Sequence, residues 1–113
     1  MKKVSEKFID TKAHRLSPIS NRVLTHHQFE LKERGDKLTY ERSFAANVSI
    51  VVELENFDGK NMRGREWQVY KKFNGILIPM GVAVTLGELS KITEATVGVR
   101  LTKIYKKLAY TFK

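Results

Sequence analysis

Basic and aromatic side chains are interleaved through residues 57–73 of this 113-residue chain. In chain order they are Phe57, Lys60, Arg63, Arg65, Trp67, Tyr70, Lys71, Lys72 and Phe73. Lysine and arginine bind phosphate groups, and an aromatic ring offers a flat face on which an unpaired base stacks, at about 1–3 kcal/mol per base. The segment therefore has the side-chain types that bind single-stranded nucleic acid, since the bases of a duplex are already stacked.

Eight of these residues are the candidate nucleic-acid contacts: Phe57, Lys60, Arg63, Arg65, Trp67, Tyr70, Lys71 and Lys72. On a strand, alternation places Trp67 and Phe73 on one face and Tyr70 on the other. One of the two faces must cover a core, so core packing is the alternative for Trp67 and Phe73. Tyr70 and the flexible basic side chains then remain for contact.

Positive charge gathers at three places along the chain. The whole sequence has 21 Lys and Arg against 12 Asp and Glu, a net charge of +9. Residues 1–27 carry a net +4, residues 99–113 a net +5, and residues 60–72 a local +4 within an otherwise balanced middle. Clusters of this kind attract polyanions by neutralising phosphates and releasing counterions. A basic balance that only keeps the protein soluble, an anionic membrane surface and an acidic protein are the alternatives.

Residues that perform catalysis are sparse. The chain has no Cys, and its only histidines are His14, His26 and His27, without metal-ligand spacing. Gly59-Lys60 lacks the rest of a phosphate-binding loop, and we expect Glu53 and Glu55 to pair with basic residues on a neighbouring strand. We therefore expect no enzyme, no cofactor and no metal. The short apolar runs and the absence of a secretory signal predict a cytoplasmic protein that does not enter a membrane.

The spacing of apolar residues predicts the elements that position these side chains. Two alternating segments flank the turn residues 34–36 as a hairpin, and residues 47–57 form the strongest strand. Asn74-Gly75 joins strands over 65–73 and 76–85. At Thr85 the period changes, and Thr85 with Glu88 predicts a capping box that starts a helix at Leu86.

These elements predict an α+β fold, with a twisted antiparallel sheet of four to five strands and a C-terminal helical region. Residues 1–22 show no sustained period and are interpreted as a basic N-terminal arm, and residues 23–113 as one sheet-plus-helix domain. Val97, Leu101, Ile104, Tyr105 and Leu108 continue a helical stripe. Core packing explains this stripe, and a helix partner in a dimer is the alternative.

Part of the chain resembles a known family. The segments Phe57-x-Gly59-Lys60, Arg65-Glu66-Trp67, Pro79-x-Gly81 and Val84-Thr85-Leu86, in this order before a helix, resemble the transcriptional positive-cofactor-four family. The resemblance covers about residues 47–95. It implies a small homodimer, joined through its helices, that binds single-stranded DNA on a curved antiparallel sheet, with Phe57, Lys60, Arg65 and Trp67 on the binding ridge.

The chain departs from the family in two respects. The family's basic residues after Pro-Gly are replaced by Met80, Val82 and Ala83, and residues 61–64 are more polar and one residue shorter than the matching strand.

The sequence thus predicts a protein that binds single-stranded nucleic acid, with DNA preferred over RNA and little sequence specificity, in replication, recombination or transcription. We expect a homodimer joined through the C-terminal helix. One alternative is a small regulator that docks on a polymerase or nuclease through its helical face. Another is a binder of structured RNA or duplex that grips the backbone with its two basic ends.

Overall fold

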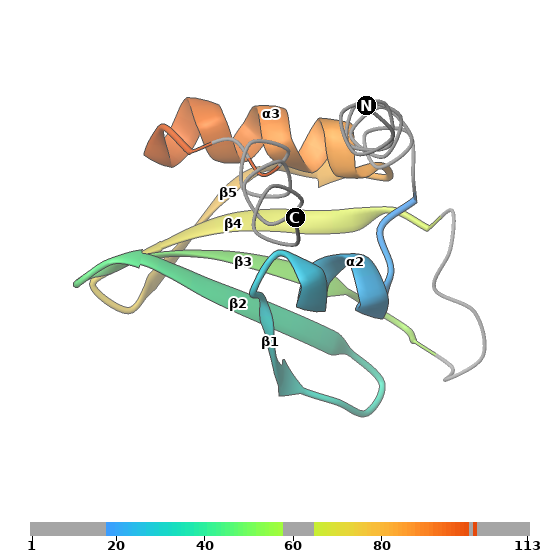
Figure 1. Cartoon of the computed structure of the whole chain (residues 1–113). Coiled ribbons are helices and arrows are strands. Elements are labelled where there is room, and N and C mark those ends of the chain that lie inside the picture. The colour runs from blue at the N-terminus through green and yellow to red at the C-terminus, as the bar shows by residue number, and fades with distance from the viewer. Residues whose placement is uncertain (1–17, 58–64, 100, 102–113) are drawn as a thin grey trace, which may run out of the picture.

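The computed structural model describes residues 18–57, 65–99 and 101. In chain order their elements are α2 (Asn21–His26), β1 (Glu30–Glu33), β2 (Leu38–Ala45), β3 (Val48–Leu54), β4 (Trp67–Phe73), β5 (Ile76–Ala83) and α3 (Leu86–Val97). Together they make a five-stranded sheet and a C-terminal helix (Figure 1). The α+β fold and the antiparallel sheet predicted from the sequence are confirmed.

The sheet is an open meander in which every strand is antiparallel to its neighbour, in the order β1-β2-β3-β4-β5. Short turns join β1 to β2, β2 to β3 and β4 to β5, whereas the twelve residues 55–66 separate β3 from β4. Between β4 and β5, Asn74 and Gly75 both have positive φ, at 50° and 81°, as the two-residue turn with the matching twist requires. One row across the sheet consists of Tyr40, Val52, Val69 and Gly81, so these four positions share one face.

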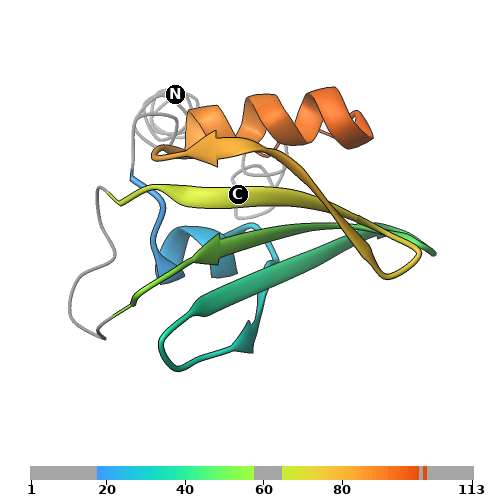
Figure 2. The same ribbon diagram turned by 180° about the vertical axis from the view of Figure 1, so that it is seen from behind.

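The hydrophobic core lies on the face of the sheet that the helices cover. α2 lies over β2 and β3, and α3 runs along β5; Figure 2 shows the strands from the opposite side, in front of α2. Trp67 and Tyr40 meet edge to face at the centre, with ring centroids 5.9 Å apart. The other fully buried large side chains of the core include Ile19, Leu24, Leu38, Ile50, Leu54, Leu86, Leu89 and Leu101.

α3 begins and ends at residues that satisfy its free backbone groups. The Thr85 hydroxyl accepts from the Glu88 N–H at 3.2 Å, and the Glu88 carboxylate accepts from the Thr85 N–H at 3.1 Å, so the predicted capping box is present. Hydrogen bonds from the backbone N–H groups of Val84 and Thr85 hold the pKa of Glu88 below its usual range. Gly98 ends the helix in the left-handed region, with φ 77°.

The folded part of the chain begins earlier than the sequence predicts. Ile19 is fully buried and donates its N–H to the Val84 carbonyl at 2.9 Å, and Pro18 bridges to Thr85. Ser20 caps the short helix α2, which sequence periodicity did not reveal because six residues are too few to show a period. Residues 18–22 therefore belong to the domain and not to the arm predicted over 1–22, and residues 1–17 lie outside the described residues.

We expect Thr85→Ala to lower the free energy of unfolding by about 1 kcal/mol, because the Glu88 N–H loses its acceptor at the start of α3. Urea denaturation followed by circular dichroism measures the change. Lys91→Gln, at an exposed site of the same helix, is the control and should stay within about 0.5 kcal/mol of the parent protein. Equal stability of Thr85→Ala and the control would show that the cap contributes nothing.

Candidate nucleic-acid interface

The pleat of β4 divides the predicted binding residues between the two faces of the sheet. Trp67, Val69, Lys71 and Phe73 lie on the helix-covered face, and Gln68, Tyr70 and Lys72 lie on the opposite, open face. The two faces are those that the alternation predicts. The predicted contacts of β4 therefore do not form one surface.

Two of the predicted aromatic contacts are buried. Trp67 is 0% exposed and packs against Tyr40, so the core alternative is the one that the structure realises. Phe57 is 8% exposed, lies beneath the Arg34 guanidinium at 5.6 Å, and donates its N–H to the Asp36 carbonyl. Neither ring offers a free face to a base, because each face is already covered by the fold.

The open face places Tyr70 and Lys72 among carboxylates. The Tyr70 hydroxyl donates to Glu53 at 3.5 Å, and Lys72 Nζ pairs with Glu41 at 3.5 Å. Burial first, and then the charges of Glu53 and Glu55, raise the pKa of Tyr70. The register also puts Glu30 and Glu33 on this face, opposite Glu41 and Thr39. A phosphate chain laid across the open face would therefore meet four carboxylates.

The remaining predicted contacts lie around the connection between β3 and β4. Arg65 is half-buried just before β4 and donates to the Asn56 carbonyl at 3.4 Å. Lys60 and Arg63 lie outside the described residues. The Arg65-Glu66-Trp67 triplet leads into β4, whereas in the family that the sequence resembles it ends a strand.

A second set of basic and aromatic side chains lies on the helix-covered face, at the end of the sheet near the Asn74-Gly75 turn. The Arg42 guanidinium stands 4.4 Å from the centre of the Phe44 ring, and Lys71 Nζ stands 5.5 Å from the centre of the Phe73 ring. We call Arg42, Phe44, Lys71 and Phe73 the basic–aromatic patch. Phe73 is its most accessible ring, at 44% exposed.

The patch contains no carboxylate. The register places Arg42, Ile50, Lys71 and Ile78 in one row across β2, β3, β4 and β5, and Ala45, Val48, Phe73 and Ile76 in the last row of the sheet. Phe44 lies at the irregularity between Ser43 and Ala45 and packs against the core. Arg42 also donates to the His27 carbonyl at 3.1 Å, which fixes its position beside Phe44. Its burial lowers the pKa of Arg42 from the usual value, and the guanidinium stays charged at neutral pH.

Sequence reasoning missed Arg42 and Phe44 as candidate contacts. Arg42 interrupts the apolar alternation of Leu38, Tyr40 and Phe44, and this interruption was the available signal. A charged side chain on the inward face of an amphipathic strand needs a local reason. Here Arg42 is only partly buried, and its guanidinium is held by the His27 carbonyl and the Phe44 ring.

The described residues are electrically neutral as a group. They contain nine Lys and Arg and nine Asp and Glu, so the whole net charge of +9 belongs to residues 1–17, 58–64, 100 and 102–113. Several of the basic residues in the described part are also paired with acids, Lys37 with Glu53 at 3.3 Å and Lys32 with Glu30 at 3.2 Å. The positive charge that could attract a polyanion therefore belongs mainly to the segments outside the described residues.

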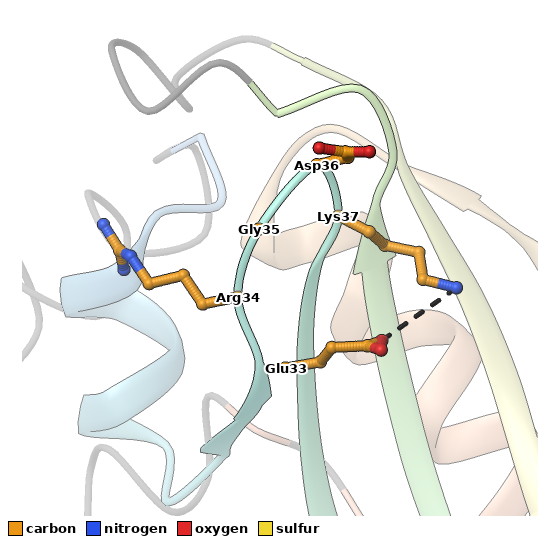
Figure 3. A pocket seen from close by; sticks show the side chains of 5 residues that line it. All are labelled: Glu33, Arg34, Gly35, Asp36 and Lys37. Carbon is orange, nitrogen blue, oxygen red and sulfur yellow. Dashed lines mark ion pairs between the residues drawn. The ribbon is translucent and has the colours of Figure 1, made fainter.

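The turn between β1 and β2 forms a shallow hollow lined by residues 33–37, shown in Figure 3. Arg34 points toward α2, Asp36 points away from it at the top of the turn, and Lys37 reaches back to Glu33 at 4.0 Å. The contact with Glu53 raises the pKa of Lys37. Lys37 is engaged by Glu33 and Glu53, and Arg34 stands over the Phe57 ring, so we assign this hollow no ligand.

Residues 18–57, 65–99 and 101 contain no group of three or more His, Cys, Asp or Glu side chains arranged to hold a metal ion. Among the helices of this part, none has the length and apolar character to cross a membrane.

Comparison of the chain with models of protein families, with curated proteins and with solved structures finds no match. The resemblance to the positive-cofactor-four family stays a hypothesis.

Because Trp67 is enclosed by the core, we expect Trp67→Ala to lower the free energy of unfolding by about 3–5 kcal/mol. Trp67→Phe should cost less, since the indole Nε1 has no hydrogen-bond partner among the described residues. In the parent protein, Trp67 emission should be poorly quenched by acrylamide and unchanged by added oligonucleotide. Strong quenching by an oligonucleotide, with Trp67→Ala as stable as the parent protein, would show that Trp67 is a contact residue and not part of the core.

Proposed function

We propose that this protein binds single-stranded nucleic acid with little sequence specificity, and that the basic–aromatic patch is the contact surface of its folded domain. The observation that carries the proposal is the juxtaposition in this patch of two cations with two aromatic rings, without a carboxylate. A base stacks on the exposed ring of Phe73 while Lys71 and Arg42 face the phosphates on either side.

The distribution of charge supports different roles for two parts of the chain. The neutral domain provides the surface on which bases stack, and the basic residues of segments 1–17, 58–64, 100 and 102–113 supply the long-range attraction. Contacts of that kind neutralise phosphates without reading bases, so the affinity is non-specific and falls steeply with salt. None of these proposed contacts recognises the edge of a base, so we assign the protein little sequence preference.

Single strands are favoured over duplex for a steric and a stacking reason. Phe73 presents one ring beside a lysine at the end of a sheet, and a ring of this kind stacks only on a base that has lost its neighbour. Duplex would meet the same cations without that stacking energy. The preference therefore comes from Phe73, and the general affinity comes from charge.

A second candidate function is a protein-interaction module, and one specific observation favours it. Ile76, Leu77, Ile78, Met80 and Val82 are all exposed on β5, between 38% and 65%. Apolar surface gathered on one strand is typical of an interaction site. This candidate predicts no affinity for an oligonucleotide at low salt, whereas the first predicts clear binding.

We expect Phe73→Ala to weaken the binding of a labelled single strand of about 20 nucleotides by roughly tenfold, the loss of one stacked base. Fluorescence anisotropy measures the dissociation constant, with unlabelled duplex as a poor competitor. Leu31→Ala is the matched control, since Leu31 is 42% exposed on the far edge of the sheet. Equal affinities for the two variants would exclude Phe73 as a stacking platform.

Replacing Lys103, Lys106 and Lys107 by Gln should reduce the slope of log affinity against log salt by about 2, since each contact with a single strand contributes about 0.7. The matched control replaces Lys32, Lys37 and Lys91, which changes the net charge by the same amount within the described domain. We expect the control to keep most of the parent slope. Equal slopes for the two triple variants would mean that net charge alone, and not its location, sets the affinity.

A further inference from the structure

β5 combines the amino-acid pattern of a central strand with the position of an edge strand. Its eight residues, Ile76–Ala83, include no charged residue, and seven of them are exposed. A continuous apolar run is typical of a strand that is buried on both faces between neighbours. In the described part of the chain, however, β5 pairs only with β4 and ends the sheet.

Both faces of β5 contribute to this exposed surface. The register places Ile76 and Ile78 on the helix-covered face, opposite Phe73 and Lys71, and it places Leu77 and Val82 on the open face, opposite Lys72 and Gln68. α3 packs along part of the strand, yet Ile76 stays 65% exposed and Ile78 42%. The contact of Ile19 and Pro18 covers the chain only at Val84 and Thr85, beyond the end of β5.

The opposite edge of the sheet is protected in the usual way. β1 is four residues long and reads Glu-Leu-Lys-Glu, and short, charged edge strands resist pairing with other chains. The exposed residues of α3 are also mostly polar, since Glu88, Lys91 and Glu94 face outward. β5 is therefore the element of the described chain that best suits an apolar partner, and neither β1 nor the outward side of α3 matches it.

We propose that β5 is the interface of a homodimer, in which a second copy of this chain lays its own β5 alongside. A two-fold axis brings each strand against the same strand of its partner, and an uncharged strand accepts this without a contact between like charges. Apolar side chains then meet on both faces at once, which explains why both faces of β5 are apolar. This assignment differs from the helix-mediated dimer expected from the sequence.

Pro79 shapes this contact. Because Asn74-Gly75 is a two-residue turn, Phe73 and Ile76 exchange main-chain hydrogen bonds, and alternation directs the main chain of Leu77 and Pro79 away from β4. Pro79 has no N–H to offer there, and the register with β4 is irregular beside it. The two β5 strands of the dimer are therefore held together by side-chain contacts more than by a continuous ladder of main-chain hydrogen bonds. An interrupted ladder also disfavours the addition of further strands.

The exposed area predicts a dimer of moderate strength. Five large side chains that are each about half exposed present on the order of 400 Å² of apolar surface, comparable to the largest patch on a typical monomer. Two copies together bury on the order of 800 Å², less than the roughly 1,600 Å² of a standard stable interface. We therefore expect a concentration-dependent dimer with a dissociation constant in the micromolar range.

Sedimentation velocity of the full chain without nucleic acid, from about 1 to 200 µM, tests the proposal. The parent protein should pass from monomer to dimer in this range. Two double variants, Ile76→Thr with Ile78→Thr and Leu77→Thr with Val82→Thr, keep the net charge and place strand-favouring β-branched residues while removing apolar surface from one face each. Each should raise the dissociation constant at least tenfold, and Leu31→Thr on β1 should leave it unchanged.

A second measurement uses the absence of native cysteine in the chain. Met80→Cys, near the middle of β5, should form a disulfide-linked dimer under mild oxidation, whereas Leu31→Cys should not. A parent protein that stays monomeric at 200 µM, or a dimer that survives both β5 double variants, would overturn the proposal. Because neither measurement contains an oligonucleotide, such a failure leaves the proposed nucleic-acid binding untouched, and the reverse also holds.

Discussion

The position of Trp67 in the core is the constraint on which the surfaces of the sheet depend. Because successive side chains of a strand point to opposite faces, burying Trp67 against Tyr40 commits Lys71 and Phe73 to the helix-covered face. For the same reason Tyr70 and Lys72 lie on the open face, where Tyr70 donates a hydrogen bond to Glu53 and Lys72 pairs with Glu41. A shift of one residue in the register of β4 would exchange the two sets and leave the indole in solvent.

This division explains why the open face is a poor surface for a polyanion, although neither α2 nor α3 covers it. Its cations pair with carboxylates on neighbouring strands. These ion pairs contribute to the fold and leave little positive electrostatic potential above this face. At the end of the helix-covered face the core stops before the strands do, and Arg42 and Lys71 stand over aromatic rings and not beside acids. The proposed function follows from this difference in the partners of similar side chains.

The two proposals share the end of the sheet near Asn74-Gly75, because Ile76 and Ile78 lie next to Phe73 and Lys71. A two-fold axis perpendicular to the sheet would place both basic–aromatic patches on the same face of a ten-stranded dimer. Each strand of nucleic acid would then meet two stacking rings in one particle, and linked contacts raise the apparent affinity without any new interaction. Dimerisation through β5 would thus also serve the proposed binding, while each remains separately measurable.

The sequence by itself determined the features that depend on neighbouring residues. The alternation of Val48, Ile50, Val52 and Leu54, the turn at Asn74-Gly75 and the cap at Thr85 and Glu88 are local, and the structure confirms each of them. Tertiary structure alone decided which face of β4 covers the core, because alternation defines two faces without choosing between them. It also decided that Arg42 shares a row with Lys71 two strands away and that β5 ends the sheet, since a local pattern does not show how a strand pairs beyond its own hairpin.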